Sequence, residues 1–114
     1  KSEIKNSVIG EKTFVPHFNY VGDSYMGKNV NMGAGSKIAN LRNDSENVMM
    51  YVKNKLFDTG RTKFGAVIAS DASIGVNCSI KPGRKIGLGA ATDSHEKVEK
   101  NIPDGKTLKN GEIV

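Results

Sequence analysis

The stretch PHFNYVGDSYMGKNVNMGAG, Pro16 to Gly35, has an aliphatic residue or Met that returns every five or six positions and is usually followed by Gly. Similar spacing extends over most of residues 4–91. An α-helix would need apolar residues three and four positions apart, and a half-buried strand would need strict alternation, so neither pattern fits. A period of six indicates short strands joined by tight turns and stacked in coils around a narrow aliphatic column.

Two series of hexads carry this pattern. With the aliphatic residue as position one, they start at the following residues: Ile9, Val15, Val21, Met26, Met32 and Ile38 in the first series, and Ile68, Ile74, Ile80 and Ile86 in the second. The fifth position is usually small or slim, as at Ala72 and Cys78. We expect positions one and five to point inward and Gly or Asn to form the corners. Cys78 is the only cysteine, and its position predicts a buried thiol rather than a nucleophile.

The period is lost between the two series and again after Thr92. Residues 43–63 therefore read as an inserted loop or hairpin, in which residues 48–52 and 56–57 could form two short strands around a turn. This insertion is either a functional loop or a hairpin that only covers a coil edge. We expect the tail, residues 93–114, to cap the open end of the coil, with a short helix around Ser94–Glu99.

Composition limits the remaining possibilities. The 114 residues suit a single domain spanning 1–114, and the formal net charge of +5 favours anionic partners. No apolar run approaches the roughly 18 residues of a membrane span, and no signal-peptide core is present. We therefore expect a cytoplasmic protein without a membrane partner. Because the chain starts at Lys1 and repeats begin almost at once, we expect it to be the C-terminal part of a longer polypeptide.

His17 stands at position three of the hexad that starts at Val15, so its ring is expected to point outward. The hexad that starts at Met32 comes three hexads, or one coil, after the one that starts at Val15. Its third residue is Ala34, which should therefore lie over His17. The segment Gly33–Gly35 would then run beside the imidazole with almost no side chain, and a thin ligand could lie against bare backbone there. An outward histidine beside such a strip is a candidate functional residue.

Three segments point to a known family: GDSYMGKNVNMGAGSKIAN at 22–40, NLR at 40–42 and SIKPGRKIG at 79–87. They resemble the acetyltransferase domain of the bifunctional sugar-1-phosphate nucleotidylyltransferase / glucosamine-1-phosphate N-acetyltransferase family, especially its archaeal type. The resemblance implies an all-β fold, a left-handed parallel β-helix of hexapeptide repeats. It also implies a homotrimer with active sites between subunits.

The resemblance further implies an N-acetyltransferase of UDP-N-acetylhexosamine synthesis. Acetyl would move from acetyl-CoA to the amine of an amino-sugar 1-phosphate, either glucosamine-1-phosphate or galactosamine-1-phosphate. The residue that matches the general base is His17, a side-chain type that titrates near neutrality and can take the ammonium proton. Mg²⁺ would be required only if an upstream nucleotidylyltransferase domain is present, and no metal site is expected in these residues.

Other matching positions bind the two substrates. Three of them hold the amino-sugar phosphate: Lys5, Tyr20 and Asn31. Two line the acetyl-CoA side: Ala34 and Asn40. Arg42 replaces an acidic residue of the bacterial enzymes, which leaves sugar selectivity open and adds a cation that we expect to contact the phosphate.

Three other classes of protein were compared with this pattern. A γ-class carbonic anhydrase needs three zinc-binding histidines, and this chain has only His17 and, in the tail, His95. A nucleic-acid module would need a recognisable motif or an array of stacking aromatic residues, and neither is present. A catalytically silent β-helix that only trimerises or regulates a nucleotidylyltransferase domain stays open, because a fold does not imply activity.

Overall fold

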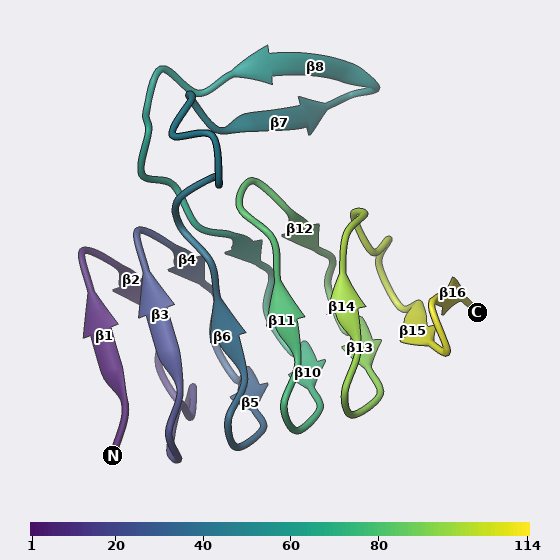
Figure 1. Cartoon of the computed structure of the whole chain (residues 1–114). Helices are drawn as coiled ribbons and strands as arrows, with labels where there is room; N and C mark the ends of the chain where they lie inside the picture. The colour runs from purple at the N-terminus through teal and green to yellow at the C-terminus, as the bar shows by residue number, and fades with distance from the viewer.

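The computed structural model describes residues 1–114 and contains strands but no helix (Figure 1). Most strands are only two or three residues long, and nearly all of them pair in parallel with the strand one coil before or after. The chain is therefore a parallel β-helix, a stack of coils with three flat sheets. Nothing in it has the length and apolarity of a helix that could cross a membrane.

Apart from the last strand of the chain, each sheet takes one strand from each successive coil. The first sheet contains β1 (Glu3–Lys5), β3 (Tyr20–Gly22), β6 (Lys37–Ile38), β11 (Ser79–Ile80) and β14 (Lys97–Val98). The second contains β5 (Asn31–Met32), β10 (Ser73–Ile74), β13 (Ala91–Thr92), β15 (Thr107–Lys109) and β16 (Glu112–Ile113). The third contains β2 (Val8–Ile9), β4 (Tyr25–Met26), β9 (Val67–Ile68) and β12 (Lys85–Ile86).

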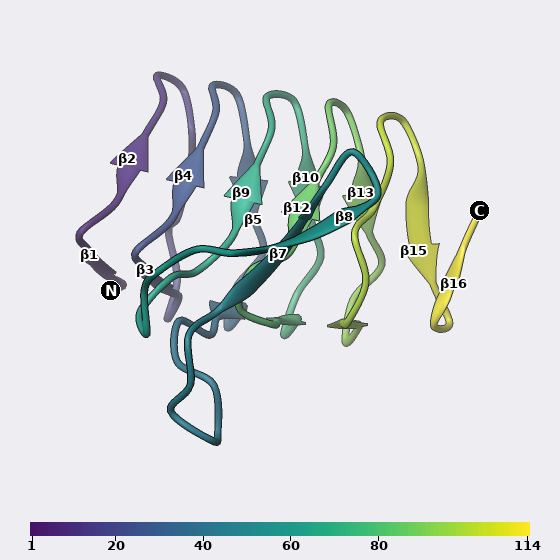
Figure 2. The same ribbon diagram turned by 90° about the horizontal axis from the view of Figure 1, so that it is seen from above.

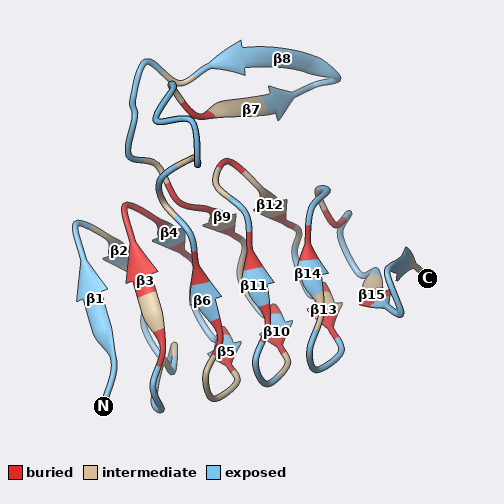
Figure 3. Cartoon of the chain, in the orientation of Figure 1, coloured by how far each residue is buried: buried red, intermediate tan, exposed pale blue.

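Position one of the hexads fills the interior, as the sequence predicts. Ile38 pairs with Ile80, and Ile80 pairs with Val98, so the aliphatic side chains stack from coil to coil. Figure 3 shows that buried residues recur at the same place in successive coils, at the arrowhead ends of β6, β11 and β14. Eight of the ten predicted position-one residues are buried, and the other two, Ile9 and Val15, pack against the core from its first coil.

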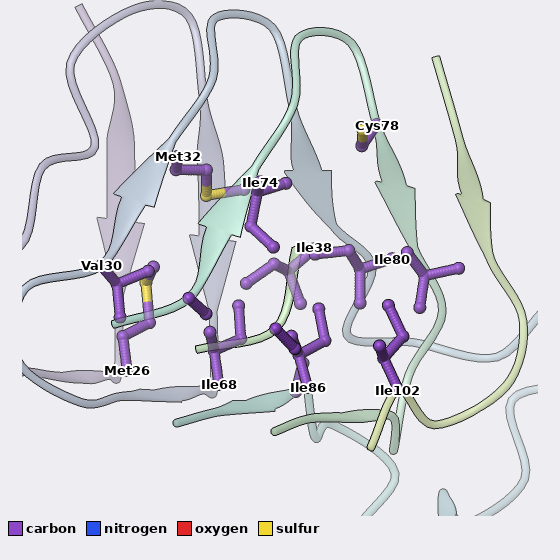
Figure 4. Close-up of a cluster of buried hydrophobic side chains, with 14 of the residues drawn as sticks. Met26, Val30, Met32, Ile38, Ile68, Ile74, Cys78, Ile80, Ile86 and Ile102 are labelled. Atoms are coloured by element: carbon purple, nitrogen blue, oxygen red, sulfur yellow. The ribbon is translucent and has the colours of Figure 1, made fainter. Parts of the chain in front are cut away.

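The core is a cluster of 16 buried residues, to which Ala72 and Cys78 at position five belong. Figure 4 shows the aliphatic and methionine side chains of successive coils in contact along the column. Each fully buried side chain of the size of Ile or Met stabilises the fold by about 1.5–3 kcal/mol. The column therefore holds the coils in one register and sets the position of every residue on their surface.

The coil edge between the second and first sheets carries His17. Four residues stack there with left-handed backbone: Phe18 (φ 52°), Gly35 (φ 76°), Asn77 (φ 54°) and His95 (φ 62°). We call these residues and the ones preceding them, at 17–18, 34–35, 76–77 and 94–95, the His17 edge. His95 thus lies on the same edge as His17, several coils away, and not in an irregular tail.

The expectation of a helix around Ser94–Glu99 is wrong, because the coil continues through it. β14 lies within that segment, and three apolar residues beyond Thr92 are buried: Val98, Ile102 and Leu108. Thr92 and Val98 continue the period of six after Ile86. The sequence pattern did not show this, because Thr92 is polar. At the end of the chain β15 and β16 pair antiparallel, which is the only departure from parallel pairing among the three coil sheets.

The insertion contains an antiparallel hairpin of β7 (Met49–Val52) and β8 (Lys55–Asp58). Its two-residue turn, Lys53 (φ 50°) and Asn54 (φ 64°), has both residues in the left-handed region that a type I′ turn requires. Figures 1 and 2 show the hairpin outside the coils, crossing over them toward β12. At its base a Cβ on Gly83 would stand 2.9 Å from Val48 Cγ1, so the absent side chain lets the insertion approach the coil.

Candidate functional site

His17 is exposed, and its coil register is the predicted one. Phe14 pairs with Asn31, which places Ala34 one coil beyond His17. The Gly35 N–H donates to the His17 carbonyl oxygen at 2.9 Å. In the next step along the edge the Asn77 N–H donates to the Ala34 carbonyl oxygen at 2.8 Å. Backbone hydrogen bonds thus fix the segment Gly33–Gly35 beside the turn that carries the imidazole.

The turn that carries His17 is braced by Asn19, a residue with only 3% of its surface exposed. The Asn19 Oδ1 accepts the His17 N–H at 3.0 Å. Its Nδ2 donates to the Gly33 and Ser36 carbonyl oxygens, at 2.7 and 3.1 Å. One side chain therefore joins the His17 turn to the first residue of the bare segment in the next coil and to Ser36, which follows that segment.

The segment Gly33–Gly35 leaves one backbone donor free. The N–H groups of Gly33 and Gly35 donate to carbonyl oxygens of neighbouring coils, whereas the Ala34 N–H has no partner. A Cβ on Gly33 would lie 2.5 Å from the Gly75 carbonyl carbon, so only glycine fits at this position. The segment that follows His17 one coil later thus contains an unpaired N–H, and an oxyanion site needs such a donor.

A second group of polar residues lies at the other end of β3. The Asn40 Nδ2 donates to the Tyr20 hydroxyl oxygen at 3.0 Å and to Asp23 Oδ2 at 2.7 Å. A Cβ on Gly22 would stand 2.6 Å from the Asn40 amide nitrogen, so the missing side chain makes room for this contact. Because both N–H donors of Asn40 are used, only its Oδ1 is available, as an acceptor.

Two cations border this group. Lys5 pairs with Gly22 in the register of β1 and β3, and its side chain is exposed. Arg61, from the insertion, has its Nη2 3.8 Å from Asp23 Oδ1. The Asp23 carboxylate is almost completely buried while the guanidinium is mostly exposed. The group therefore presents positive charge to solvent above a buried carboxylate.

Arg42 already has partners in its own loop. Its Nη2 donates to Asp44 Oδ2 at 2.6 Å, and its Nη1 donates to the Asn47 carbonyl oxygen at 3.1 Å. The Glu46 N–H and then the Arg42 guanidinium hold the pKa of the exposed Asp44 carboxyl below its usual value. Arg42 thus stabilises the conformation of the first residues of the insertion.

The sequence-predicted residues fall on different surfaces of one chain. Tyr20 belongs to the first sheet and Asn31 to the second, and both are accessible from outside the coil. His17 and Ala34 lie on the edge between those sheets, while Asn40 lies beyond the opposite end of the first sheet. No group of three or more side chains suited to hold a metal ion is present.

Two positions with clear structural roles were missing from the sequence-based assignment. Asn19 is at position five of the hexad that starts at Val15, which the pattern directs inward. A polar residue at an inward position is the signal that could have identified it, because a buried polar side chain needs hydrogen-bond partners. Asp23 is at position three of its hexad, so the pattern gave no signal for it.

Comparison with known proteins identifies the family of the chain. No protein-family model matches it. It is 43% identical over 107 residues to the bifunctional sugar-1-phosphate nucleotidylyltransferase/acetyltransferase of Sulfurisphaera tokodaii, covering 94% of this chain and 27% of that protein. This chain belongs to the acetyltransferase-domain family of these bifunctional enzymes.

Further relatives of the family also match most of this chain but only a small part of their own length. The bifunctional protein GlmU of Methanococcus aeolicus is 40% identical over 117 residues, covering 99% of this chain and 28% of that protein. The bifunctional protein GlmU of Desulfitobacterium hafniense is 37% identical, covering 89% of this chain and 18% of that protein. The chain thus spans about a quarter of the length of its archaeal relatives.

Solved structures support the fold. A serine acetyltransferase from Neisseria gonorrhoeae matches with a TM-score of 0.73 at 15% identity, over 96% of this chain and 38% of that one. A maltose O-acetyltransferase from Clostridium difficile matches with a TM-score of 0.68 at 18% identity, over 100% of this chain and 65% of that one. The family fold is therefore that of known acetyltransferases.

Proposed function

We propose that the chain is an N-acetyltransferase that moves acetyl from acetyl-CoA to the amine of an amino-sugar 1-phosphate, glucosamine-1-phosphate or galactosamine-1-phosphate. Its product would be used in UDP-N-acetylhexosamine synthesis. The observation that carries the proposal is the register, which places Ala34 with its unpaired N–H one coil beyond the exposed His17. The family membership of the chain supports the same chemistry, since its Sulfurisphaera tokodaii relative is named a sugar-1-phosphate nucleotidylyltransferase/acetyltransferase.

In the proposed reaction the nitrogen of the sugar amine attacks the thioester carbonyl carbon. His17 removes the ammonium proton, which makes the nitrogen lone pair available. The Ala34 N–H donates to the carbonyl oxygen as negative charge develops on it. The C–S bond then breaks and the acetyl group remains on the nitrogen as an amide. The nitrogen loses a second proton in this step and the sulfur gains one, so coenzyme A leaves as the thiol.

The other residues would hold the substrates. Lys5 supplies a cation for the sugar phosphate, and Tyr20 and Asn31 supply polar groups for the sugar. Asn40 can only accept a hydrogen bond, so we assign its Oδ1 to an N–H group of the coenzyme arm. We do not assign the phosphate to Arg42, because its guanidinium is held by Asp44 and Asn47.

We also propose that the active unit is a homotrimer of left-handed coils. Asn31 lies on a different sheet from the hydrogen-bonded pair of Tyr20 and Asn40, so a compact site requires a neighbouring subunit to supply part of it. Sedimentation equilibrium at micromolar concentration should give the mass of three chains. A mass of one chain in a preparation that transfers acetyl groups would contradict this assembly.

The proposal is tested by measuring thiol release from acetyl-CoA with glucosamine-1-phosphate or galactosamine-1-phosphate as acceptor. Glucose-1-phosphate is the matched control, because it keeps the phosphate and lacks the amine. We expect release with at least one amino sugar and none with the control. A folded trimer that releases no thiol with either amino sugar would instead support the silent, regulatory β-helix.

A further inference from the structure

A cavity of 770 Å³ lies between the β7–β8 hairpin and the coil edge formed by Lys81–Arg84 and Glu99–Asn101. None of its lining residues belongs to the His17 edge or to the hydrogen-bonded group of Tyr20, Asn40 and Asp23. Its volume is in the range of small-molecule sites. We call it the hairpin cavity, and the proposed acetyl transfer does not use it.

The hairpin supplies an apolar wall to this cavity. Met49, Tyr51 and Leu56 line it, and Tyr51 pairs with Leu56 across the two strands. Tyr51 and Leu56 are 55% and 51% exposed, although they face the coil side of the hairpin. An aromatic ring and an aliphatic side chain next to each other in a cavity provide a surface for a flat ring system.

The opposite wall carries positive charge. The Arg84 Nε donates to the Glu99 carbonyl oxygen at 2.7 Å, and its Nη1 donates to the Pro82 carbonyl oxygen at 2.8 Å. These bonds fix the guanidinium and leave its Nη2 without a partner. Lys100, on the same side, forms no ion pair. The cavity therefore contains two cations that no carboxylate neutralises, one held by hydrogen bonds and one without a partner.

The other charges of the cavity compensate each other. Arg42 pairs with Asp44 at 2.6 Å, and Lys81 pairs with Glu99 at 3.2 Å. Hydrogen bonding from Lys81, with the nearby charge of Lys97, holds the pKa of the Glu99 carboxyl below its usual value, so the carboxylate stays ionised at neutral pH. Two uncompensated positive charges remain, which matches a ligand with a di-anionic group.

We propose that the hairpin cavity binds a nucleoside phosphate, with the base against Tyr51 and Leu56 and the phosphates at Arg84 and Lys100. An inorganic anion would leave the apolar wall unused, and an uncharged ring compound would leave two cations unpaired. Two sources present this chemistry: a free nucleotide, or the nucleotide end of coenzyme A. The inference does not depend on the acetyl transfer proposed above.

Calorimetric titration of the 114-residue chain with ADP, adenosine and inorganic phosphate tests the inference. ADP should bind at least about tenfold more tightly than adenosine or phosphate, because only ADP engages both walls. Lys100→Ala, which removes no contact of the folded chain, should weaken ADP binding about tenfold. Tyr51→Leu should weaken it about threefold or more, because it keeps an apolar side chain but removes the ring.

The control is Lys28→Ala, an exposed lysine on another edge of the coil, which should leave ADP affinity unchanged. Absence of ADP binding, or equal ADP affinity in Lys100→Ala, Tyr51→Leu and the parent chain, overturns the inference. Titration with coenzyme A distinguishes the sources. Loss of coenzyme A affinity in Lys100→Ala identifies its nucleotide end as the ligand, and unchanged affinity identifies a free nucleotide. His17→Ala should keep ADP binding, which separates this site from the proposed acetyl transfer.

Discussion

Asn19 and His17 are joined by a hydrogen bond in which the Asn19 Oδ1 accepts the His17 backbone N–H at 3.0 Å. The same Asn19 amide donates to two carbonyl oxygens of the next coil through Nδ2. Its hydrogen-bonding capacity is fully used, and no other side chain joins the His17 turn to the Gly33–Gly35 segment. The position of the imidazole thus depends on a buried amide two residues away.

Asn19→Asp tests this brace with little change in shape. It replaces the Nδ2 donors by an oxygen that faces the Gly33 and Ser36 carbonyl oxygens, so unfolding free energy should fall by at least about 2 kcal/mol at pH 7. The introduced carboxyl has its pKa raised on folding, so the penalty is complete well above its folded pKa. It shrinks as the pH falls toward the unfolded value of about 4.

Denaturant titrations at several pH values measure that difference against the parent chain. Asn6→Asp is the matched control, since Asn6 is exposed and asparagine and aspartate both tolerate its left-handed backbone (φ 49°). It should change stability by less than about 0.5 kcal/mol. If both substitutions lowered the unfolding free energy equally at pH 7, the Asn19 hydrogen bonds would not stabilise the His17 turn.

Gly33→Ala tests how closely the coils approach at the candidate site. The added Cβ would meet the Gly75 backbone at 2.5 Å, which a side-chain rotation cannot relieve. We expect a loss of about 3 kcal/mol or more in unfolding free energy. Gly89→Ala is the comparison, because a Cβ there meets nothing within 4 Å and the cost of about 1 kcal/mol comes from its left-handed backbone (φ 62°) alone. A Gly33→Ala variant as stable as Gly89→Ala would contradict the close approach.

Leu108→Ala tests whether the last coil belongs to the core. Leu108 is 1% exposed and is part of the buried cluster, so its truncation should cost about 2–5 kcal/mol. Leu88→Ala removes the same atoms at a position that is 53% exposed and should cost less than about 1 kcal/mol. Thermal unfolding of both variants measures the difference. If the two substitutions lowered stability by the same small amount, Leu108 would not be packed in the core as the structure shows.

The period of six predicted the coil and its core because stacking repeats the same contact in every turn, and position one of each hexad has the same neighbours. It failed after Thr92 because a hydroxyl occupies the position-one place there, and because Ile102 follows Val98 after only four residues. A polar residue and a shortened turn together removed the signal, although the backbone pairing continued.

For the candidate site, the repeat correctly predicted that Ala34 follows His17 along one coil edge, because that prediction needs only the number of residues in a coil. The Tyr20–Asn40–Asp23 contacts depend on side-chain conformations that no repeat determines. The pairing of Arg42 with Asp44 depends on the shape of an insertion outside the period. The roles of His17, Ala34, Tyr20 and Asn40 in substrate binding and catalysis stay predictions.

Lys5→Ala tests the assignment of the sugar phosphate. A phosphate contact is present in both the bound substrate and the transition state, so its loss should raise KM for the amino-sugar phosphate about tenfold and change kcat less than about threefold. Initial rates at varied sugar phosphate and saturating acetyl-CoA measure both constants. A fall in kcat with unchanged KM would place Lys5 in the chemical step instead.

The proposed role of His17 as general base is tested most directly by the turnover of His17→Ala at saturating substrates. Lys28→Ala is the control, since Lys28 is exposed on a different edge, whereas His95 shares the His17 edge and is unsuitable. We predict that His17→Ala lowers kcat by about 10²- to 10⁴-fold and leaves acetyl-CoA affinity and assembly unchanged. Turnover equal to that of the parent chain, in a folded protein of the same mass, would contradict the assignment.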